Sequence, residues 1–287
     1  MKHLILSAAM ICAASVAANV AATAQKPNEI SAYIAGGLSA LKYKEGKPGF
    51  GGAIGAGYTY YFNDFLGAFG GLEVGLHSAN ISTSLAGEGK KVYSDASRNE
   101  EFDFRFSATG YKEKHSAVYL SVPLMAQYRA DISDMFEFYA AGGLKVGFSV
   151  SGSYSATIDQ VKTSGYFPES GQTFENMPAH GFSTYNNISS TGKYSFQLNV
   201  APIAEAGVRY KLSDDFAIHA AVYIAYGLTD ASPSKSNALP VDYRDDTSAK
   251  IAYPGLLQAQ GDNGKNYTDK INLFSTGLKI TVSRAIR

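Results

Sequence analysis

Hydrophobic and polar residues alternate with a period of two along residues 119–129. One face is apolar throughout and consists of Leu120, Val122, Leu124, Ala126 and Tyr128. The opposite face carries Gln127 and Arg129 among other residues. Strict alternation over about ten residues is typical of a β-strand with one apolar face. A tilted strand of about 9–11 residues is also long enough to cross the hydrocarbon core of a bilayer.

The same alternation recurs along the chain and predicts eight strands. We expect them at residues 30–41, 50–62, 65–77, 119–129, 136–150, 194–212, 216–228 and 270–282. Short turns follow the second, fourth and sixth strands, whereas the long polar stretches 78–115, 151–193 and 229–269 follow the third, fifth and seventh. This sorting of short turns to one end and long loops to the other is typical of a transmembrane barrel. Within 78–115, the alternating Phe102, Phe104 and Phe106 indicate that the next strand extends beyond the membrane.

The predicted fold class is therefore all-β: an eight-stranded antiparallel up-and-down transmembrane β-barrel, with short periplasmic turns and three long extracellular loops. A soluble eight-stranded barrel or sandwich is the alternative, because alternation alone does not say which face points outward. The two folds make opposite predictions for the same side chains. In the membrane barrel, lipid contacts Leu124, Val146, Val208 and Ile280, while Lys145 and Glu205 lie inside.

Residues 1–24 are predicted to be a secretory signal, and residues 25–287 to be the barrel domain. Lys2 and His3 precede an apolar, Ala-rich run that ends in the small-residue pattern 22–24. Cys12, the only cysteine, lies within this signal, so the mature chain is expected to have no disulfide and no thiolate metal site. A net charge of zero gives no reason to expect nucleic acid as a partner. Charged residues make up 17% of the chain, below the soluble-domain average of about 25%.

Three short stretches resemble a known family. Residues 119–124, Tyr-Leu-Ser-Val-Pro-Leu, are similar to the fourth strand of OmpA-like eight-stranded outer-membrane β-barrel proteins, the porin-family group of Gram-negative bacteria. Residues 139–143, Tyr-Ala-Ala-Gly-Gly, resemble the fifth strand of that family. The resemblance covers nearly all of residues 25–287. It implies insertion into the outer membrane after export to the periplasm, with outer-membrane lipids around the barrel.

The third stretch, residues 275–282, resembles the terminal signal that the outer-membrane assembly machinery reads in this family. The positions that match are Ser275, Gly277, Ile280 and Val282. The pattern differs from the family's in its small polar residue and in the five residues, 283–287, that follow where many members end at an aromatic residue. The assembly machinery is accordingly an expected partner during insertion.

Charged side chains on the predicted inward faces form the main candidate site. They are Glu73, Lys145, Glu205, Arg209 and Lys279. An eight-stranded barrel has an interior just wide enough for side chains, so a packed charge network is favoured over a functional relay. The narrow interior also argues against a general porin.

No catalytic, cofactor-binding or metal-binding residue is predicted. The histidines His77, His115, His180 and His219 lie in no recognisable catalytic motif, although His77 and His115 fall near the outer rim, where a lipid-modifying enzyme would act. Asp245 and Asp246 are interpreted as solvated loop charges. The stretch 262–266 is interpreted as a hairpin turn, because it lacks the downstream glutamate of a calcium loop.

Three functional hypotheses follow from these patterns. The favoured one is a non-enzymatic protein with a structural or surface-interaction role, whose Tyr-, Ser-, Asn- and Gly-rich loops suit an extracellular protein or glycan ligand. The second is a lipid-modifying enzyme at the rim. The third is a narrow channel, or a subunit of a larger envelope assembly. The sequence identifies no ligand.

Overall fold

The computed structural model describes residues 28–43, 46–95, 100–236, 238–244, 251–261, 265–268 and 270–286. One short 3-10 helix, η1 (Pro178–His180), accompanies the strands in these ranges. The strands are β1 (Asn28–Lys42), β2 (Lys47–Tyr61), β3 (Leu66–Asp95), β4 (Glu100–Asp131), β5 (Phe136–Phe167), β6 (Gln172–Phe174), β7 (Thr184–Tyr194), β8 (Asn199–Lys211), β9 (Phe216–Tyr226), β10 (Asp242–Tyr243), β11 (Ile251–Ala252) and β12 (Asn272–Ile286). No described helix is long and apolar enough to cross a membrane.

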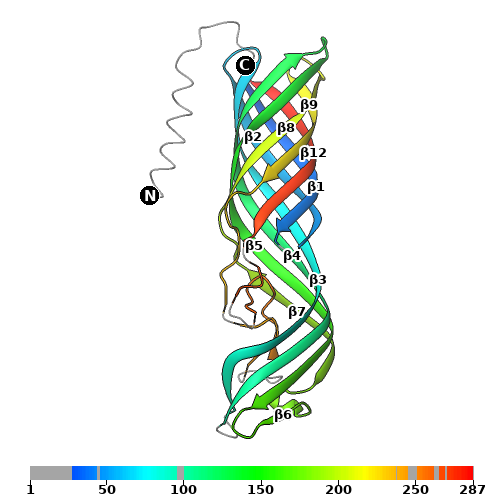
Figure 1. Ribbon diagram of the computed structural model, residues 1–287. Helices are drawn as coiled ribbons and strands as arrows, with labels where there is room; N and C mark the ends of the chain where they lie inside the picture. Colours follow the sequence, from blue (N-terminus) through cyan, green and yellow to red (C-terminus); the bar gives the residue numbers. More distant parts are fainter. Residues whose placement is uncertain are drawn as a thin grey trace, which may run out of the picture.

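Eight antiparallel strands close into a ring. They follow the chain order β1, β2, β3, β4, β5, β8, β9 and β12, and β12 pairs back onto β1 from Asn28↔Ile286 to Lys42↔Asn272 (Figure 1). Strand order that follows chain order defines an up-and-down barrel, in which closure leaves no unpaired edge. The predicted fold class is confirmed.

The apolar faces of the strands point outward. Leu124 is 55% exposed, while Lys145 and Glu205 are buried. Val208 and Ile280 are also exposed, and Val146 is half-buried on the same face. Such an exterior is unfavourable in water and favourable in hydrocarbon, since burying apolar surface contributes about 25 cal/mol per Å². The membrane polarity is therefore correct, and the soluble alternative is not.

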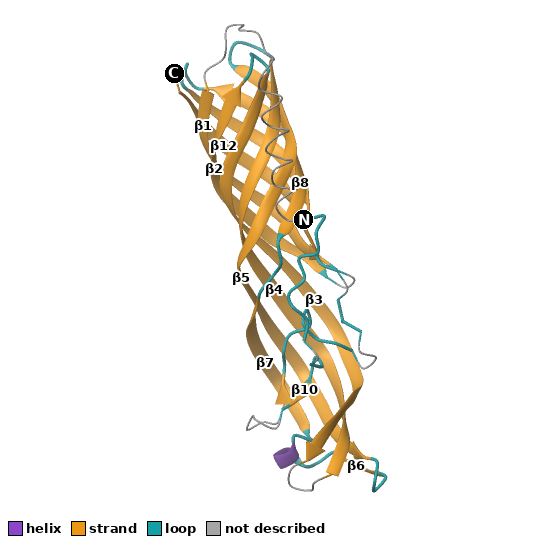
Figure 2. Ribbon diagram, turned by 90° about the vertical axis from the view of Figure 1, so that its left-hand side faces the viewer, coloured by secondary structure: helices purple, strands orange, loops and turns teal. Residues whose placement is uncertain are grey.

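Three strands are far longer than a membrane requires. β3 has 30 residues, and β4 and β5 have 32 each. The prediction of long loops at 78–115 and 151–193 was thus largely wrong, because these segments continue the strands (Figure 2). The strands continue beyond the barrel because their inward faces bury a second apolar core there. Phe102, Phe104 and Phe106 point into this core in regular alternation, as the sequence indicated for that part of β4.

A β-bulge at Gly110 changes which residues of β4 point inward. The register against β3 shifts between Thr83 and Leu85, and Gly110 adopts a left-handed φ of 65°. On the distal side of the bulge Ala108 is buried, whereas on the barrel side the odd-numbered residues from Tyr111 onward are buried. Bulges of this kind insert one residue and re-aim the side chains that follow.

The sixth barrel strand is interrupted. Residues 194–212 were predicted to form one strand, but β7 ends at Tyr194 and β8 begins at Asn199, although both keep the same register on β5. Phe196, which was expected to face outward, is buried instead, because it packs edge-on against Tyr194 at 5.7 Å. The last strand also extends further than predicted, to Ile286 rather than residue 282.

Beyond the barrel, the extended strands form a separate folded unit. We call its described residues within 80–117, 151–194 and 229–271 the distal module; it lies at the lower end of Figure 1, whereas the C-terminus lies at the upper end. Its interior is a continuous apolar cluster that contains the rings of Tyr93, Phe102, Phe167, Phe182 and Tyr243. Phe102 stacks on Phe167 and meets Phe182 edge-on, and Tyr93 meets Tyr243 edge-on. The third long loop supplies Leu256 and Leu257 to the same cluster. The third long loop is therefore part of the apolar core of the distal module.

Candidate functional site

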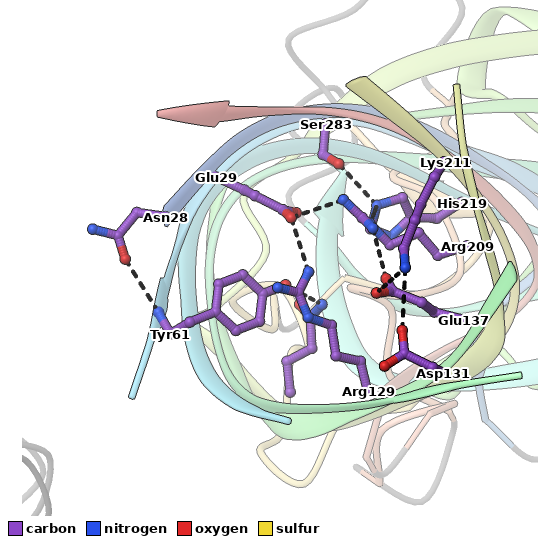
Figure 3. Close-up of polar contacts among 11 residues, drawn as sticks. Asn28, Glu29, Tyr61, Arg129, Asp131, Glu137, Arg209, Lys211, His219 and Ser283 are labelled. Atoms are coloured by element: carbon purple, nitrogen blue, oxygen red, sulfur yellow. Dashed lines mark hydrogen bonds and ion pairs between the residues drawn. The ribbon is translucent and has the colours of Figure 1, made fainter. Parts of the chain in front are cut away.

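Two arginines share one carboxylate at the short-turn end of the lumen. Glu29 Oε1 accepts hydrogen bonds of 2.9 Å from both Arg129 and Arg209 (Figure 3). The Arg129 guanidinium also lies over the Tyr61 ring, 3.8 Å from its centroid. All of these side chains are buried. Strands that are not neighbours in the ring are thereby tied together, since Glu29 is the second residue of β1, whereas Arg129 lies on β4 and Arg209 on β8.

A second carboxylate continues this network toward the periplasmic edge. Arg209 donates a 2.6 Å bond to Glu137 Oε2, and Lys211 Nζ lies 3.1 Å from both Glu137 Oε1 and Asp131 Oδ1. Arg209 Nε donates to His219 Nε2 at 3.3 Å, so this ring nitrogen acts as an acceptor (Figure 3). The histidine is thus fixed by an arginine.

Two ion pairs cross the middle of the lumen. Lys145 Nζ donates to Glu73 Oε1 at 2.9 Å, and Tyr33 OH donates to the other oxygen of Glu73 at 3.0 Å. Lys279 Nζ donates to Glu205 Oε2 at 2.7 Å and lies 4.1 Å from the centroid of the Tyr33 ring. Tyr33 thus donates a hydrogen bond to the acid of the first pair and presents its ring to the cation of the second, and such additional contacts help to offset the desolvation of a buried pair.

The charged side chains inside the lumen balance one another and fill most of its space. The buried lumen acids are Glu29, Glu73, Glu137 and Glu205, and the buried lumen bases are Arg129, Lys145, Arg209 and Lys279. The cavities beside these pairs each have a volume of about 20 Å³. A water molecule needs about 10–15 Å³ of such volume, so each cavity accommodates one water and no larger ligand.

At the outer end of the lumen, His77 Nδ1 lies 3.0 Å from Ser39 Oγ. The His77 ring packs edge-on against Tyr119, and Ser39 is buried. A serine and a histidine at this distance have the spacing of a nucleophile and its base. The adjoining cavity, however, is one of the 20 Å³ spaces. The pair contacts no space large enough for a substrate.

Glu113 is the centre of a buried cluster above the lumen. Its carboxylate accepts hydrogen bonds from Tyr111 OH, from Tyr194 OH at 2.7 Å, and from the Leu256 backbone N–H at 3.1 Å to Oε2. His115 Nε2 lies 2.6 Å from Oε1, and Tyr43 OH lies 2.9 Å from His115 Nδ1. This cluster joins the sheet of the distal module to its last loop.

Burial and hydrogen bonding shift the pKa values of this cluster in opposite directions. Burial alone raises the pKa of Glu113, but the hydrogen bond and charge of His115 and the two tyrosine hydroxyls outweigh it, and the net pKa is lowered. Burial, together with the nearby Glu113 charge, raises the pKa of Tyr111 and of Tyr194. Glu113 is therefore held as the carboxylate, and the tyrosines as donors.

The structure brings the predicted lumen residues together in pairs. Glu73 meets Lys145, Glu205 meets Lys279, and Arg209 meets acids that the prediction did not connect to it. Glu29 was missed because the first strand was predicted to begin at residue 30, two positions after its start at Asn28. Glu113 was missed because it falls in a stretch that was interpreted as a loop, although its alternation with Tyr111 and His115 was a usable signal.

The remaining predicted residues are placed as follows. Ser275 points inward, whereas Ile280 and Val282 lie on the exposed apolar face. At Gly277 a Cβ atom would lie 2.1 Å from the Gly36 carbonyl oxygen, so β12 approaches β1 there as only glycine allows. His180 ends η1 and stacks on Phe182. The predicted signal peptide, Asp245, Asp246 and residues 262–264 lie outside the described residues, which contain no cluster of three or more metal-binding side chains.

A closed antiparallel ring with an apolar belt outside and paired charges inside defines an integral outer-membrane β-barrel protein. A family model described as "Outer membrane protein beta-barrel domain" matches residues 21–233. The chain belongs to this family. It resides in the outer membrane of a Gram-negative bacterium, embedded in the lipids of that membrane.

Three solved structures are similar to this chain at low sequence identity. Neisserial surface protein A is 12% identical over 92% of this chain and 100% of its own, with a TM-score of 0.33. Ail of Yersinia pestis is 12% identical over 90% and 98%, with a TM-score of 0.30. OprG of Pseudomonas aeruginosa is 11% identical over 92% and 97%, with a TM-score of 0.35. Among curated proteins, no sequence matches this chain.

Proposed function

We propose that the protein is a non-enzymatic surface-interaction protein, in which the barrel is an anchor and the distal module presents a binding surface to the exterior. The observation that carries the proposal is the length of β3, β4 and β5. At about 3.4 Å per residue, a 32-residue strand spans roughly 110 Å, whereas a membrane strand needs only about 9–11 residues. Most of each strand therefore builds something other than the membrane barrel.

The distal module is organised as a rigid support. Its aromatic core is fully buried at Phe102, Phe104 and Phe167. Each buried aromatic side chain contributes roughly 1.5–3 kcal/mol relative to exposure, and stacked pairs contribute about 0.5–1.5 kcal/mol more. A preorganised surface loses little conformational entropy on binding, which favours recognition of a partner. The outer faces of its strands carry mainly Ser, Thr, Asn and Lys, which suit a protein or glycan ligand.

An enzyme at the rim is the less favoured alternative. Ser39 and His77 adjoin a cavity of about 20 Å³, and both ring nitrogens of His115 have hydrogen-bonding partners. A general base must reach a bound substrate, directly or through one water. The same filled interior weighs against a channel, because the pairs Lys145–Glu73 and Lys279–Glu205 occupy the middle of the lumen.

The test compares cells that display the intact protein with cells whose distal module has been shaved by protease. Loss of adhesion to protein-coated and glycan-coated surfaces after shaving, together with heat-modifiable migration of the remaining barrel on gels, is the expected result. Planar bilayers containing the purified protein should show no conductance. A deletion strain with altered lipid A masses would overturn the proposal in favour of the rim enzyme, and stepwise conductance would overturn it in favour of the channel.

Insertion of the barrel is proposed to depend on the terminal strand. Gly277 and the outward-facing Ile280 and Val282 have the spacing that the assembly machinery reads in this family. Replacing Gly277 by Val should reduce the folded fraction in the outer membrane and leave the amount of exported protein unchanged. The matched variant Gly207→Val changes an equally crowded glycine on β8, where a Cβ atom would lie 2.0 Å from the Ala220 carbonyl oxygen, away from the signal. Equal loss in both variants would assign the effect to packing and contradict a signal role.

A further inference from the structure

Exposed lysines surround the outside of the barrel where it meets the distal module. We call these residues the lysine collar: Lys42, Lys47, Lys112, Lys114, Lys193 and Lys270. They come from β1, β2, β4, β7 and the segment that precedes β12. They lie at the height along the barrel where β1 ends and β2 begins, and where β3, β4 and β5 continue into the distal module (Figure 1).

Strand register places most of the collar along neighbouring rows. Lys47 pairs with Asn80 on β3, and Asn80 pairs in turn with Lys114 on β4. Lys112 lies two residues further along the same face of β4, and Lys193 pairs with Ser153 on β5. On β1, which neighbours β2, Lys42 pairs with Asn272 of β12, two residues after Lys270.

The collar lies directly beyond the apolar belt. Phe50, Leu76 and Leu120 are the last strongly exposed apolar residues of their strands. Lys47 and Lys114 are three and six residues away from Phe50 and Leu120 respectively. At about 3.3 Å per residue along strands tilted by about 45°, this corresponds to roughly 7–14 Å above the hydrocarbon boundary. That depth is the headgroup layer of the outer leaflet.

No described residue neutralises the charge of the collar with a carboxylate. None of its lysines forms an ion pair with any described residue; Lys42 lies over the Tyr226 ring, and Lys270 donates to the Leu228 carbonyl. Lumen bases behave differently, since Lys145 and Lys279 each have a carboxylate. The short-turn end of the exterior carries exposed acids instead, at Asp64, Asp134 and Asp214.

We propose that the lysine collar binds phosphate groups of outer-leaflet lipid headgroups. An ammonium group is a compact charge that attracts phosphate, and a lysine near an anionic membrane surface strengthens attachment by roughly fivefold. The short-turn end has one such exposed cation among its described residues, Arg284, which lies over the Phe216 ring. The lysines gathered at headgroup depth at the other end therefore complement a leaflet whose headgroups carry phosphate. Lys112, Lys114, Lys193 and Lys270 belong to the membrane-side end of the distal module, but the lipid site does not depend on the partner-binding role proposed for that module.

The experiment titrates the purified, detergent-solubilised full-length protein with phosphorylated lipid A, and with the same lipid after dephosphorylation, by native mass spectrometry. We expect the wild-type protein to prefer the phosphorylated lipid at least tenfold. The variant K47Q/K112Q/K114Q/K193Q should lose most of that preference while retaining heat-modifiable migration. Equal binding of the two lipids, or an unchanged preference in the variant, would overturn the proposal.

A matched single-charge comparison separates the collar from general surface charge. Lys114 and Lys162 are both exposed and lie on neighbouring strands, and Lys162 is seven residues beyond Ser155, the partner of Lys114. That separation is about 23 Å along the strand, more than two Debye lengths at 0.15 M salt. K114Q should weaken binding severalfold, and K162Q should not change it. Equal effects would refute a collar, and inorganic phosphate competing as strongly as lipid A would refute a lipid headgroup as the ligand.

Discussion

The backbone N–H of Leu256 lies 3.1 Å from Glu113 Oε2, although the two residues are 143 positions apart in the sequence. This contact fixes the last long loop to the sheet of the distal module. Leu257 repeats it one residue later, with its N–H donating to Tyr194 OH at 3.3 Å. Because Tyr194 itself donates to Glu113, a single carboxylate organises both contacts.

Replacing Glu113 by Gln should therefore release the loop and leave the barrel intact. The amide has one acceptor where the carboxylate has two, so at least one buried donor loses its partner, at a cost of roughly 3 kcal/mol. The Leu256 and Leu257 amides should then exchange hydrogen about 100-fold faster, at 1.4 kcal/mol per factor of ten. The control is E101Q, an exposed glutamate on the same strand. Unchanged hydrogen exchange at the Leu256 and Leu257 amides in E113Q would show that Glu113 does not hold the loop.

The same cluster predicts a pH window for loop attachment. The pKa of Glu113 is lowered by His115 and the tyrosines, so its contribution is present above the usual glutamate value of about 4.3 and is lost as the pH falls through the folded-state pKa. The pKa values of Tyr111 and Tyr194 are raised by burial and by the Glu113 charge, so their contribution is present below about pH 10 and is lost as the pH rises further.

A spin label on Ala252→Cys, in the strand that precedes the Leu256 contact, would measure this window. Label mobility should be low between about pH 4.3 and pH 10 and should rise on both sides. In the E113Q background the acid transition should disappear, because the group that titrates has been removed. A label equally mobile at neutral and acid pH in the parent protein would refute the prediction.

Much of the membrane barrel could be predicted from the sequence, because one periodic signal determines it. In residues 119–129 every second residue lies on the outward apolar face, and each short turn fixes where the next strand begins. The distal module was less accessible, because a strand outside lipid needs only one buried face and its outer face reads as a loop. Phe102 and Phe104 carried the signal there, whereas the β-bulge at Gly110 shifted the alternation and obscured it.

The individual ion pairs could not be predicted in the same way. Alternation places Lys145, Glu73 and Glu205 inside, but choosing the partner of each requires the strand order and the tilt. Glu29 shows the limit most clearly. It contacts Arg129 and Arg209, residues that are 100 and 180 positions away, and no local pattern links them.

Replacing Glu29 by Gln should destabilise the short-turn end of the barrel. Two buried guanidinium groups would lose a shared carboxylate, although Arg209 would retain Glu137. Loss of one partner of a buried ion pair costs about 3–5 kcal/mol, and the retained pair places this case near the lower value. The temperature at which the heat-modifiable band converts to the unfolded form should fall. D64N, at an exposed turn, should leave it unchanged.

Removing both members of the central pair should cost less than the two single losses combined. Lys145→Met leaves the Glu73 carboxylate buried, with only Tyr33 donating to it at 3.0 Å, and Glu73→Gln leaves an ammonium group without its carboxylate. Each single variant should lose about 3–5 kcal/mol, because an uncompensated charge remains in the lumen. The double variant K145M/E73Q removes both charges, so a double-mutant cycle should give a coupling of at least 1 kcal/mol. The unfolding free energy in urea, measured in lipid vesicles, provides the values. Additive losses would show that the two side chains act independently and that the lumen pairs do not stabilise the barrel as pairs.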